Sequence, residues 1–304
     1  FTMISMNVRS IFCAVVVLAL SRHAFCKPAS YQVNSEFDVN NRNNLTASNF
    51  ASFGYYAMKK DDTERIAGGQ SANLGQFPFM AVVHRLMGQG MVSQCGGTII
   101  SSRWVLTAGH CVQPTPHTYF VVLGIIDKSI IQYDFVLQPA VAMITTQGYL
   151  HSDYEPTFND IGLLYMPQDI PFGDTIQPIR LAGYNGVMES FEGEDAIAVG
   201  WGKDGPTGTG TSNLKYTSLS IMSNQQCSQY WAVTSNHVCT TVQYGHNTCQ
   251  GDSGGPLIVY KNGVPLQVGV VSYGDANCPS GKPDVFTRVT KYVKWIQKLT
   301  SSKL

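Results

Sequence analysis

The hexapeptide Gly251-Asp252-Ser253-Gly254-Gly255-Pro256 surrounds one serine with glycines and places an acid directly before it. Glycine lets a backbone turn without steric penalty and approach a bound molecule closely, so the amides of Gly251 and Ser253 can point at a developing negative charge. A serine hydroxyl is a weak nucleophile until a base takes its proton and a third group orients that base. The motif therefore predicts nucleophilic acyl chemistry at Ser253, provided that a histidine and an acid lie elsewhere in the chain.

One histidine and one acid lie in suitable surroundings. His110, in Thr107-Ala108-Gly109-His110-Cys111, follows an apolar run and is therefore expected just past a buried strand. Asp160 opens a second apolar run, Ile161-Gly162-Leu163-Leu164. Taken alone, a histidine is more often a surface or structural residue, and an aspartate at the start of a strand is more often a turn residue or cap. Together with Ser253, the two residues predict a nucleophile, its base and an orienting acid.

In that order and in those contexts, His110, Asp160 and Ser253 resemble the triad of the chymotrypsin-like (trypsin-fold) serine proteases, and the resemblance extends from Ile66 to the C-terminal end. The order of the three residues separates this family from other folds that carry the same triad. The resemblance implies a serine endopeptidase, a hydrolase in which Ser253 attacks a peptide carbonyl and His110 transfers the proton. Asp160 would fix the histidine tautomer, and the amides of Gly251 and Ser253 would form the oxyanion hole.

The fold implied by the resemblance is all-β, with two six-stranded antiparallel β-barrels, the triad in the cleft between them and a C-terminal α-helix. Short apolar segments separated by Gly, Pro and Asn agree with such a fold. A helix is expected from about Thr290 to Thr300, because Val293, Ile296 and Leu299 fall on one helical face. The expected strands are Phe79–His84, Thr98–Thr107, Tyr119–Ile125, Asp195–Gly200, Pro256–Val259 and Leu266–Tyr273.

The composition and the N-terminal region indicate a secreted globular protein. The 304 residues are 44% hydrophobic and 13% charged with a formal net charge of zero, which favours a sizeable core and gives no reason to expect nucleic-acid binding. The apolar stretch from Ile11 to Leu20, preceded by Arg9, is too short to span a bilayer and is typical of a secretory signal peptide. Cleavage after Cys26 would remove Cys13 and Cys26 together and leave an even number of cysteines.

These observations divide the chain into a signal peptide over residues 1–26, a pro-segment (activation peptide) over 27–65 and a trypsin-like protease domain over 66–304. The pro-segment is rich in Asn, Ser and Asp and contains Asn44-Leu45-Thr46, a sequon for N-glycosylation at Asn44 that is about as often left unmodified. The extracellular protein is expected to act as a monomer without a membrane partner. Its expected partners are protein and peptide substrates, an activating trypsin-like protease, and protease inhibitors such as serpins.

The segment Arg65-Ile66-Ala67-Gly68-Gly69 resembles the activation site of the family, although Ala67 stands where valine is usual. In the family, cleavage after the basic residue releases an ammonium group that folds inward and pairs with the acid before the nucleophile. The matching groups here are Ile66 and Asp252. A buried ion pair of this kind is costly when one member is missing, so it can order the oxyanion loop only after the cut. The alternative is that Arg65 is an ordinary solvated linker residue.

Six cysteines follow Ile66, and the sequence alone does not choose among their pairings. The family resemblance implies three bridges, which are Cys95 to Cys111, Cys227 to Cys239, and Cys249 to Cys278. No His or Cys cluster has the spacing of zinc ligands, and the chemistry requires no metal or organic cofactor.

The resemblance also places the substrate pocket. Its base lies six residues before the serine, at Asn247, where trypsins carry aspartate to bind Lys or Arg, so a plain trypsin is disfavoured. Asp284 stands where trypsin and chymotrypsin have glycine and resembles the brachyurins, the collagenolytic proteases of crustaceans and insects. Either Asp284 gives a mixed pocket that also accepts basic side chains, or it is held by its neighbours and leaves a chymotrypsin-like preference. The remaining substrate-binding residues implied are Thr248, Ser272, Tyr273 and Gly274.

Two alternatives to a broadly acting protease remain. A homologue that has lost catalysis would serve as a binding or cofactor module, but such proteins usually lack the serine or the histidine, and this chain keeps both. A selective cascade or venom protease would keep the enzyme and change its role, and the sequence does not decide between that role and digestion.

Overall fold

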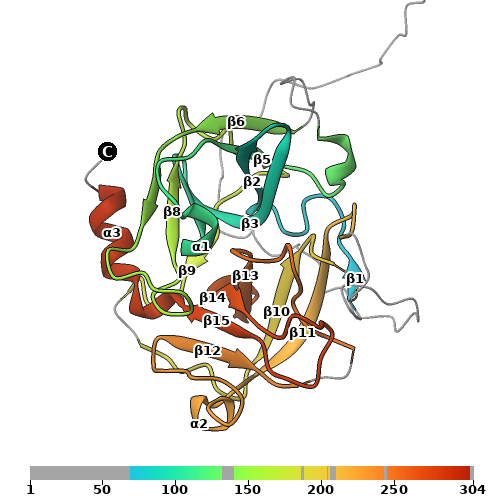
Figure 1. The fold of residues 1–304 in the computed structure, drawn as a ribbon, viewed down its shortest axis with the longest axis vertical. Helices are drawn as coiled ribbons and strands as arrows, with labels where there is room; N and C mark the ends of the chain where they lie inside the picture. Colours follow the sequence, from blue (N-terminus) through green and yellow to red (C-terminus); the bar gives the residue numbers. More distant parts are fainter. Residues whose placement is uncertain are drawn as a thin grey trace, which may run out of the picture. The chain divides into compact units, whose positions relative to one another are not determined.

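The computed structural model describes residues 69–131, 140–185, 188–203, 205, 210–242 and 245–301. The signal peptide, the pro-segment with Asn44, and the activation residues Arg65 and Ile66 therefore lie outside the described residues. Within the described residues the fold is mostly β, as expected, with two antiparallel-rich sheets and a C-terminal helix (Figure 1). No helix among these residues is long and apolar enough to cross a bilayer.

The first sheet has seven strands, and its central strands are buried on both faces. Side chains alternate between the faces of a strand, so Val83 and Val121 enter one apolar cluster while Val82 and Val122 enter another. No pairing joins the two end strands within the described residues, so this sheet is a curled half-barrel. Its strand order is β6 (Val141–Thr145), β5 (Tyr119–Leu123), β2 (Met80–Gly88), β3 (Met91–Ser101), β4 (Trp104–Thr107), β8 (Gly162–Tyr165) and β7 (Gly148–Leu150).

The second sheet closes on itself, because β11 pairs with β12 in addition to its place along the sheet. Six strands form this barrel around a core that includes Leu219, Val238, Leu257 and Phe286. The strand order is β1 (Gln70–Ser71), β11 (Lys215–Met222), β10 (Asp195–Gly200), β13 (Pro256–Lys261), β14 (Val264–Tyr273), β15 (Val285–Arg288) and β12 (His237–Thr240), with β9 (Arg180–Leu181) parallel to β14.

The helices are short, and the last one belongs to the core of the first sheet. Val293 and Ile296 of α3 are buried in the cluster that contains Trp104 and Leu106, and Leu299 packs against it, so the predicted apolar face is the one that faces the core. The helix begins later than expected because a 3₁₀ turn precedes it. The helical elements are α1 (Gly109–Val112), α2 (Asn224–Cys227), α3 (Val293–Ser301), η1 (Lys128–Ile130) and η2 (Val289–Lys291).

Candidate active site

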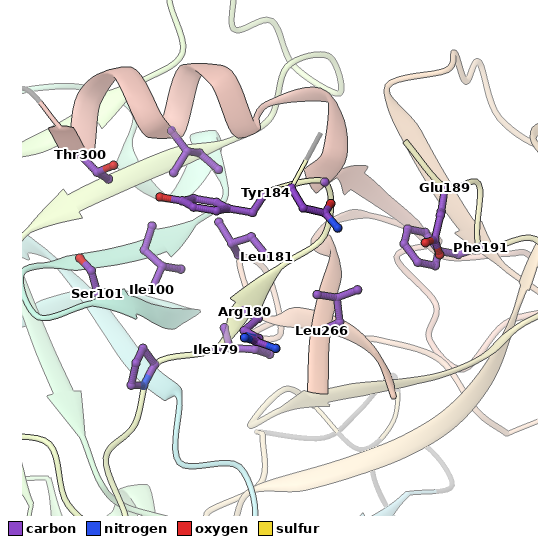
Figure 2. Close-up of a pocket in the computed structure, with 14 residues that line it drawn as sticks. Ile100, Ser101, Ile179, Arg180, Leu181, Tyr184, Glu189, Phe191, Leu266 and Thr300 are labelled. Carbon is purple, nitrogen blue, oxygen red and sulfur yellow. The ribbon is translucent and has the colours of Figure 1, made fainter. Parts of the chain in front are cut away.

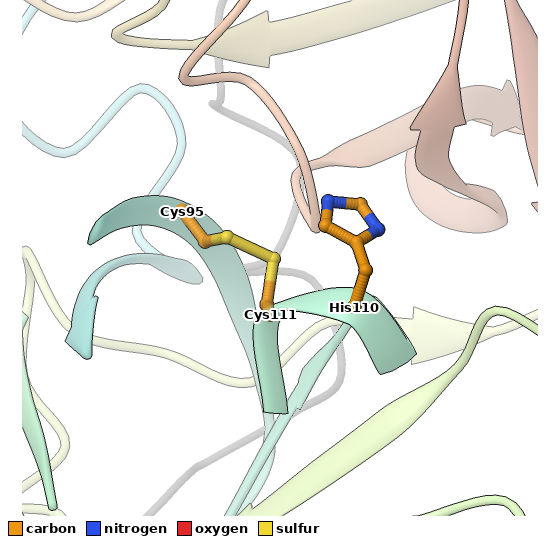
Figure 3. Close-up of side chains that lie close together, drawn as sticks. All are labelled: Cys95, His110 and Cys111. Carbon is orange, nitrogen blue, oxygen red and sulfur yellow. A yellow bond between two sulfur atoms is a disulfide. The ribbon is translucent and has the colours of Figure 1, made fainter. Parts of the chain in front are cut away.

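Helix α1 presents His110 directly after the buried strand β4. The turn into the helix requires Gly109, since a Cβ there would lie 2.8 Å from Tyr154 Cδ2 and 3.0 Å from the backbone nitrogen of Ile161. The disulfide between Cys95 and Cys111 ties the helix to β3, and Figure 3 shows the imidazole of His110 projecting beside this bridge. The two sulfur atoms are bonded to each other, so this trio is not a set of metal ligands.

The buried carboxylate of Asp160 holds both the backbone and the ring of His110. Its Oδ1 accepts a hydrogen bond of 2.8 Å from the His110 backbone N–H, and its Oδ2 lies 2.8 Å from His110 Nδ1. The hydroxyl of Ser272 donates to the same Oδ2 at 2.6 Å, and Thr287 donates to the Asp160 carbonyl. With an ionised Asp160 as acceptor, Nδ1 carries the proton and Nε2 is left as the basic nitrogen.

Two opposing effects set the pKa of Asp160. Burial favours the neutral acid, but the hydrogen bonds and charge of His110, together with the Ser272 hydroxyl, favour the carboxylate. The net result is a pKa below the ordinary value for aspartate. Asp160 is therefore an anion at neutral pH, as a group that orients and stabilises an imidazolium must be.

The loop that carries Ser253 lies against the strands that lead to His110. The Ser253 carbonyl accepts from Gly96 N–H at 2.8 Å and lies 3.7 Å from Cys111 Sγ, next to His110 in the chain. At Gly254, with φ of 82°, a Cβ would lie 3.0 Å from the Ala108 nitrogen. The fold thus brings the predicted nucleophile, base and orienting acid to one junction between the two sheets.

The amides of this loop divide into two groups. Those of Asp252, Gly254 and Gly255 donate to the carbonyls of Cys249, Val271 and Asp252 respectively. Those of Gly251 and Ser253 have no acceptor among the described residues. Gly251 also has a φ of 101°, which a residue with a side chain rarely adopts. The two amides predicted for the oxyanion hole are therefore available to a ligand.

Asp252 is buried beneath this loop, with an exposed fraction of 2%. Its oxygens accept from the backbone amides of Gly202 at 2.7 Å and Cys249 at 2.9 Å. Burial raises the pKa of Asp252 to about 6, although these amides and the nearby charge of Lys128 favour the anion. The ammonium of Lys128 itself donates to Gln94 Oε1 and to the Trp201 carbonyl, a network for which the sequence motifs give no signal.

The predicted pocket residues Asn247, Thr248 and Asp284 form one buried cluster. Asp284 accepts a hydrogen bond of 2.6 Å from the Thr248 backbone N–H and one of 3.1 Å from the Asn247 amide. A Cβ on Gly274 would lie 3.0 Å from Asp284 Oδ1, so that glycine and the carboxyl group face each other. Burial raises the pKa of Asp284 to about 7, against the effect of its hydrogen bonds.

Two of the predicted pocket residues have other contacts. The Ser272 side chain contacts Asp160 rather than this cluster. The Tyr273 ring packs edge-on against Trp231 at 5.7 Å, and its hydroxyl donates to the Ala232 carbonyl. The three predicted disulfides are all present, and the Cys249–Cys278 bridge lies beside Thr248 in the chain.

A separate cavity of about 640 Å³ lies among β9, β14, the end of β3 and α3 (Figure 2). Its walls are largely apolar and include Ile100, Leu181 and Leu266, with Arg180 and Glu189 also lining it. None of the residues predicted for catalysis or for the substrate pocket lines this cavity. The chemistry described above is therefore independent of it.

This arrangement of a serine, a histidine and a buried aspartate on an all-β fold is that of the chymotrypsin-like class of serine endopeptidases, and comparisons with known proteins agree. Residues 66–296 match the Trypsin family model. The chain is 35% identical to Chymotrypsin-2 of Vespa crabro over 77% of this chain and 99% of that protein, and 34% identical to Collagenase of Hypoderma lineatum over 78% and 87%. The solved structure of HL collagenase matches with a TM-score of 0.66 and 33% identity, covering 78% of this chain and 99% of that one.

The chain belongs to the trypsin family of serine proteases, with chymotrypsin-like relatives. This confirms the family and the enzyme class predicted from the motifs.

Proposed function

We propose that this protein is a secreted serine endopeptidase, made as a zymogen and activated by cleavage after Arg65. The observation that carries the catalytic part is the pair of hydrogen bonds from His110 to the buried Asp160. They fix the ring so that Nε2 is the free base, and they supply an anion to stabilise the imidazolium. Three disulfides in the described domain are typical of a protein that folds in an oxidising, extracellular compartment.

In the proposed reaction, Ser253 Oγ attacks the carbonyl carbon of a substrate peptide while His110 Nε2 takes its proton. The tetrahedral oxyanion accepts hydrogen bonds from the amides of Gly251 and Ser253. His110 then donates the proton to the leaving amine, and the acyl-enzyme forms as the peptide C–N bond breaks. A water molecule releases the acyl group by the same steps in reverse.

The activation step rests on the environment of Asp252. Its two backbone hydrogen bonds leave a buried carboxyl without a directly bonded cation among the described residues. A new ammonium group at Ile66 would supply that cation and would favour the anionic form by an opposite charge at close range. Because Asp252 directly precedes Ser253, the ion pair would stabilise the loop that carries the oxyanion amides.

An active-site label tests both parts. The full-length protein is treated with a serine-directed phosphonate before and after cleavage at Arg65, with Arg65→Gln as the uncleavable control and Ser253→Ala as the unlabelled one. We expect labelling of Ser253 only in the cleaved protein. Equal labelling before and after cleavage would rule out activation at Arg65, and the absence of labelling in the cleaved protein would indicate a non-catalytic binding module.

For the substrate side chain we propose a preference for large apolar residues, with cleavage after Lys or Arg that increases with pH. A neutral Asn247 at the pocket base and an Asp284 hydrogen-bonded to its neighbours support the apolar preference. The pKa of Asp284, raised by burial to about 7, supports the second part, because its negative charge develops only near that pH. A basic side chain gains a charge-assisted interaction only from the anion.

A peptide library profiled below and above about pH 7 distinguishes the two pocket models. We expect the ratio of basic to apolar cleavage to increase roughly tenfold with pH in the wild type, as for one modest charge-assisted contact. In Asp284→Gly the ratio should stay constant. Complete absence of cleavage after Lys or Arg, unchanged in Asp284→Gly, would reject the mixed pocket and leave the chymotrypsin-like one.

A further inference from the structure

The segment that leads to Asp160 contains a strained turn. Glu155 and Phe158 exchange two backbone hydrogen bonds of 3.0 and 2.9 Å, with Pro156 and Thr157 between them. The φ of Thr157 is 73°, the value that a type II turn needs at its third residue and that glycine normally supplies. Threonine is β-branched, so this conformation is unfavourable and persists only where the surroundings hold it.

A buried histidine from the second sheet holds this turn. His237, at the start of β12, has an exposed fraction of 2%, and its Nε2 lies 2.8 Å from the Thr157 carbonyl oxygen. Its Nδ1 lies 2.9 Å from the Thr234 backbone nitrogen. The Phe158 ring packs edge-on against the imidazole at 5.5 Å. Thr157 itself is exposed, so the carbonyl bond and the Phe158 contact supply the restraint.

The two backbone partners of the imidazole lie nearest and set its protonation state, whereas the Thr234 hydroxyl lies 3.4 Å from Nδ1 and can donate or accept. A backbone N–H only donates and a carbonyl oxygen only accepts, so Nδ1 must be unprotonated and Nε2 must carry the hydrogen. A second proton would be carried by Nδ1 and would point at the Thr234 N–H, so that two donors would face each other. The arrangement therefore requires neutral His237.

The turn and the catalytic segment are continuous. Asp160 follows Thr157 by three residues, and Asn159 between them is also held, because Tyr292 donates to its Oδ1 at 2.8 Å. This segment enters β8 of the first sheet, whereas His237 begins β12 of the second. The bond between His237 and Thr157 thus joins the two sheets close to the carboxylate that orients His110.

We propose that neutral His237 is a positioning residue, which holds the Glu155–Phe158 turn in its strained form and thereby keeps Asp160 aligned with His110. The proposal rests on the proposed catalytic function of that pair. Three titratable or charged groups face His237, namely Asp160 before β8, Arg288 on β15 and Tyr273 on β14. Burial, with a smaller contribution from Arg288, lowers the pKa of His237, so the neutral form is the working form at neutral pH.

Two amide variants test the roles of the two ring nitrogens of His237 separately. His237→Gln keeps an N–H donor near the Nε2 position, whereas His237→Asn keeps a polar group only near the Nδ1 position. In the Arg65-cleaved enzyme we expect kcat/KM of the Gln variant within about twofold of wild type. The Asn variant should fall by about three- to tenfold, mainly in kcat, as for the loss of one hydrogen bond.

A double-mutant cycle with Thr157→Gly tests the strain directly. Glycine adopts positive φ without penalty, so we expect His237→Asn to reduce kcat/KM by less than twofold in the Thr157→Gly background. The pH profile gives an independent readout, because protonation of His237 adds to the acid limb. Below the pKa of His237, wild-type kcat/KM should fall more steeply than that of the Gln variant.

Equal kcat/KM and equal pH profiles for the Gln and Asn variants would overturn the proposal, as would an unchanged effect of His237→Asn in the Thr157→Gly background. If the Asn variant does not fold, the Gln profile and the Thr157→Gly single variant still decide. The phosphonate label keeps the two hypotheses apart. Failure of wild type to label would count against the catalytic function, whereas labelled variants with identical kinetics would count against His237 alone.

Discussion

Asp160 and Asp284 are buried to nearly the same extent, with exposed fractions of 3% and 2%, and each accepts a short hydrogen bond from a backbone N–H. Their titration nevertheless differs in direction. The pKa of Asp160 lies below the ordinary value of an aspartate, whereas the pKa of Asp284 is raised to about 7. One is an anion throughout the physiological range, and the other changes charge within it.

The difference comes from the groups that face each carboxylate. Asp160 receives a second hydrogen bond and a favourable charge from the His110 ring, and a third hydrogen bond from Ser272. Asp284 receives its other hydrogen bonds from two neutral groups, the Asn247 amide and the Thr248 side chain, and the negative charge of Asp252 opposes its ionisation. Burial penalises both anions and each carboxylate accepts several hydrogen bonds, so the charge of the facing groups decides which one ionises.

The largest predicted effect follows from replacing the Asp160 carboxylate with a neutral amide. In Asp160→Asn the amide keeps the volume but presents an N–H group or a weaker acceptor to His110 Nδ1, which favours the wrong tautomer. We expect kcat to fall by about ten-thousandfold with little change in KM. Steady-state kinetics of the cleaved enzyme on a peptide substrate measure this.

Asp153→Asn is the matched control, because Asp153 is an exposed acid in the same segment. Its kcat should stay within about twofold of wild type, as expected for a surface substitution. An Asp160→Asn variant that kept more than about a tenth of wild-type kcat would contradict the assigned role of the carboxylate.

The second prediction concerns stability and uses Asp284→Asn. Because the folded-state pKa of Asp284 is raised to about 7, the stability that its neutral form contributes is fully present below the unfolded pKa of about 4 and is lost as pH rises through about 7. The Asn variant cannot ionise there. Between these pH values, wild type should lose on the order of a few kcal/mol relative to the variant.

The Asn variant should also lose some stability that does not depend on pH. Asn247 donates to both Asp284 and the Lys282 carbonyl and accepts from Ser280 N–H, so it cannot turn over to accept from a new amide at position 284. Denaturant unfolding at several pH values separates the offset from the slope. Parallel stability profiles for wild type and Asp284→Asn would show that Asp284 titrates as an ordinary exposed acid.

Short sequence motifs were enough to predict the main residues of this site. Three short segments predicted His110, Asp160 and Ser253, and the structure brings them to one junction. The strand Asp195–Gly200 was predicted with its observed bounds, because glycines lie near its ends and a short apolar run fills its interior. The segment Thr98–Thr107 was predicted as one strand but is two, since the turn at Ser102 and Arg103 has neither glycine nor proline to signal it.

Sequence motifs did not predict the contacts between segments that are distant in the chain. Ser272 stays a predicted substrate-binding residue with Tyr273 and Gly274, but the hydrogen bond from its hydroxyl to Asp160 was not predicted. The strand β14 has a register shift against β15 between Val271 and Tyr273, which re-aims the intervening side chain. A bulge of this kind depends on the partner strand. The pairing of His237 with Thr157 likewise joins residues 80 positions apart.

The smallest predicted effect is a rise in the pKa of Asp160, which makes its titration more like that of Asp284. Ser272→Ala removes the 2.6 Å hydrogen bond to Asp160 Oδ2 and leaves both contacts with His110, whereas Ser272→Thr retains a hydroxyl as the control. The pKa of Asp160 should rise, and the unfolding free energy at neutral pH should fall by about 1.5 kcal/mol, as for one hydrogen bond to a charged group.

The sign of the pH dependence makes this last prediction specific to the charge. A lowered folded-state pKa contributes stability that is present above the unfolded value and is lost as pH falls through the folded value. The deficit of Ser272→Ala should therefore shrink as pH falls below the unfolded pKa of about 4 and through the lower folded-state pKa, where the anion that accepts from the hydroxyl becomes protonated. A deficit that is equal at neutral and acid pH would mean that the hydroxyl serves packing alone. In that case Ser272 would not offset the cost of burying the Asp160 anion. The difference in pKa between Asp160 and Asp284 would then depend on His110 alone.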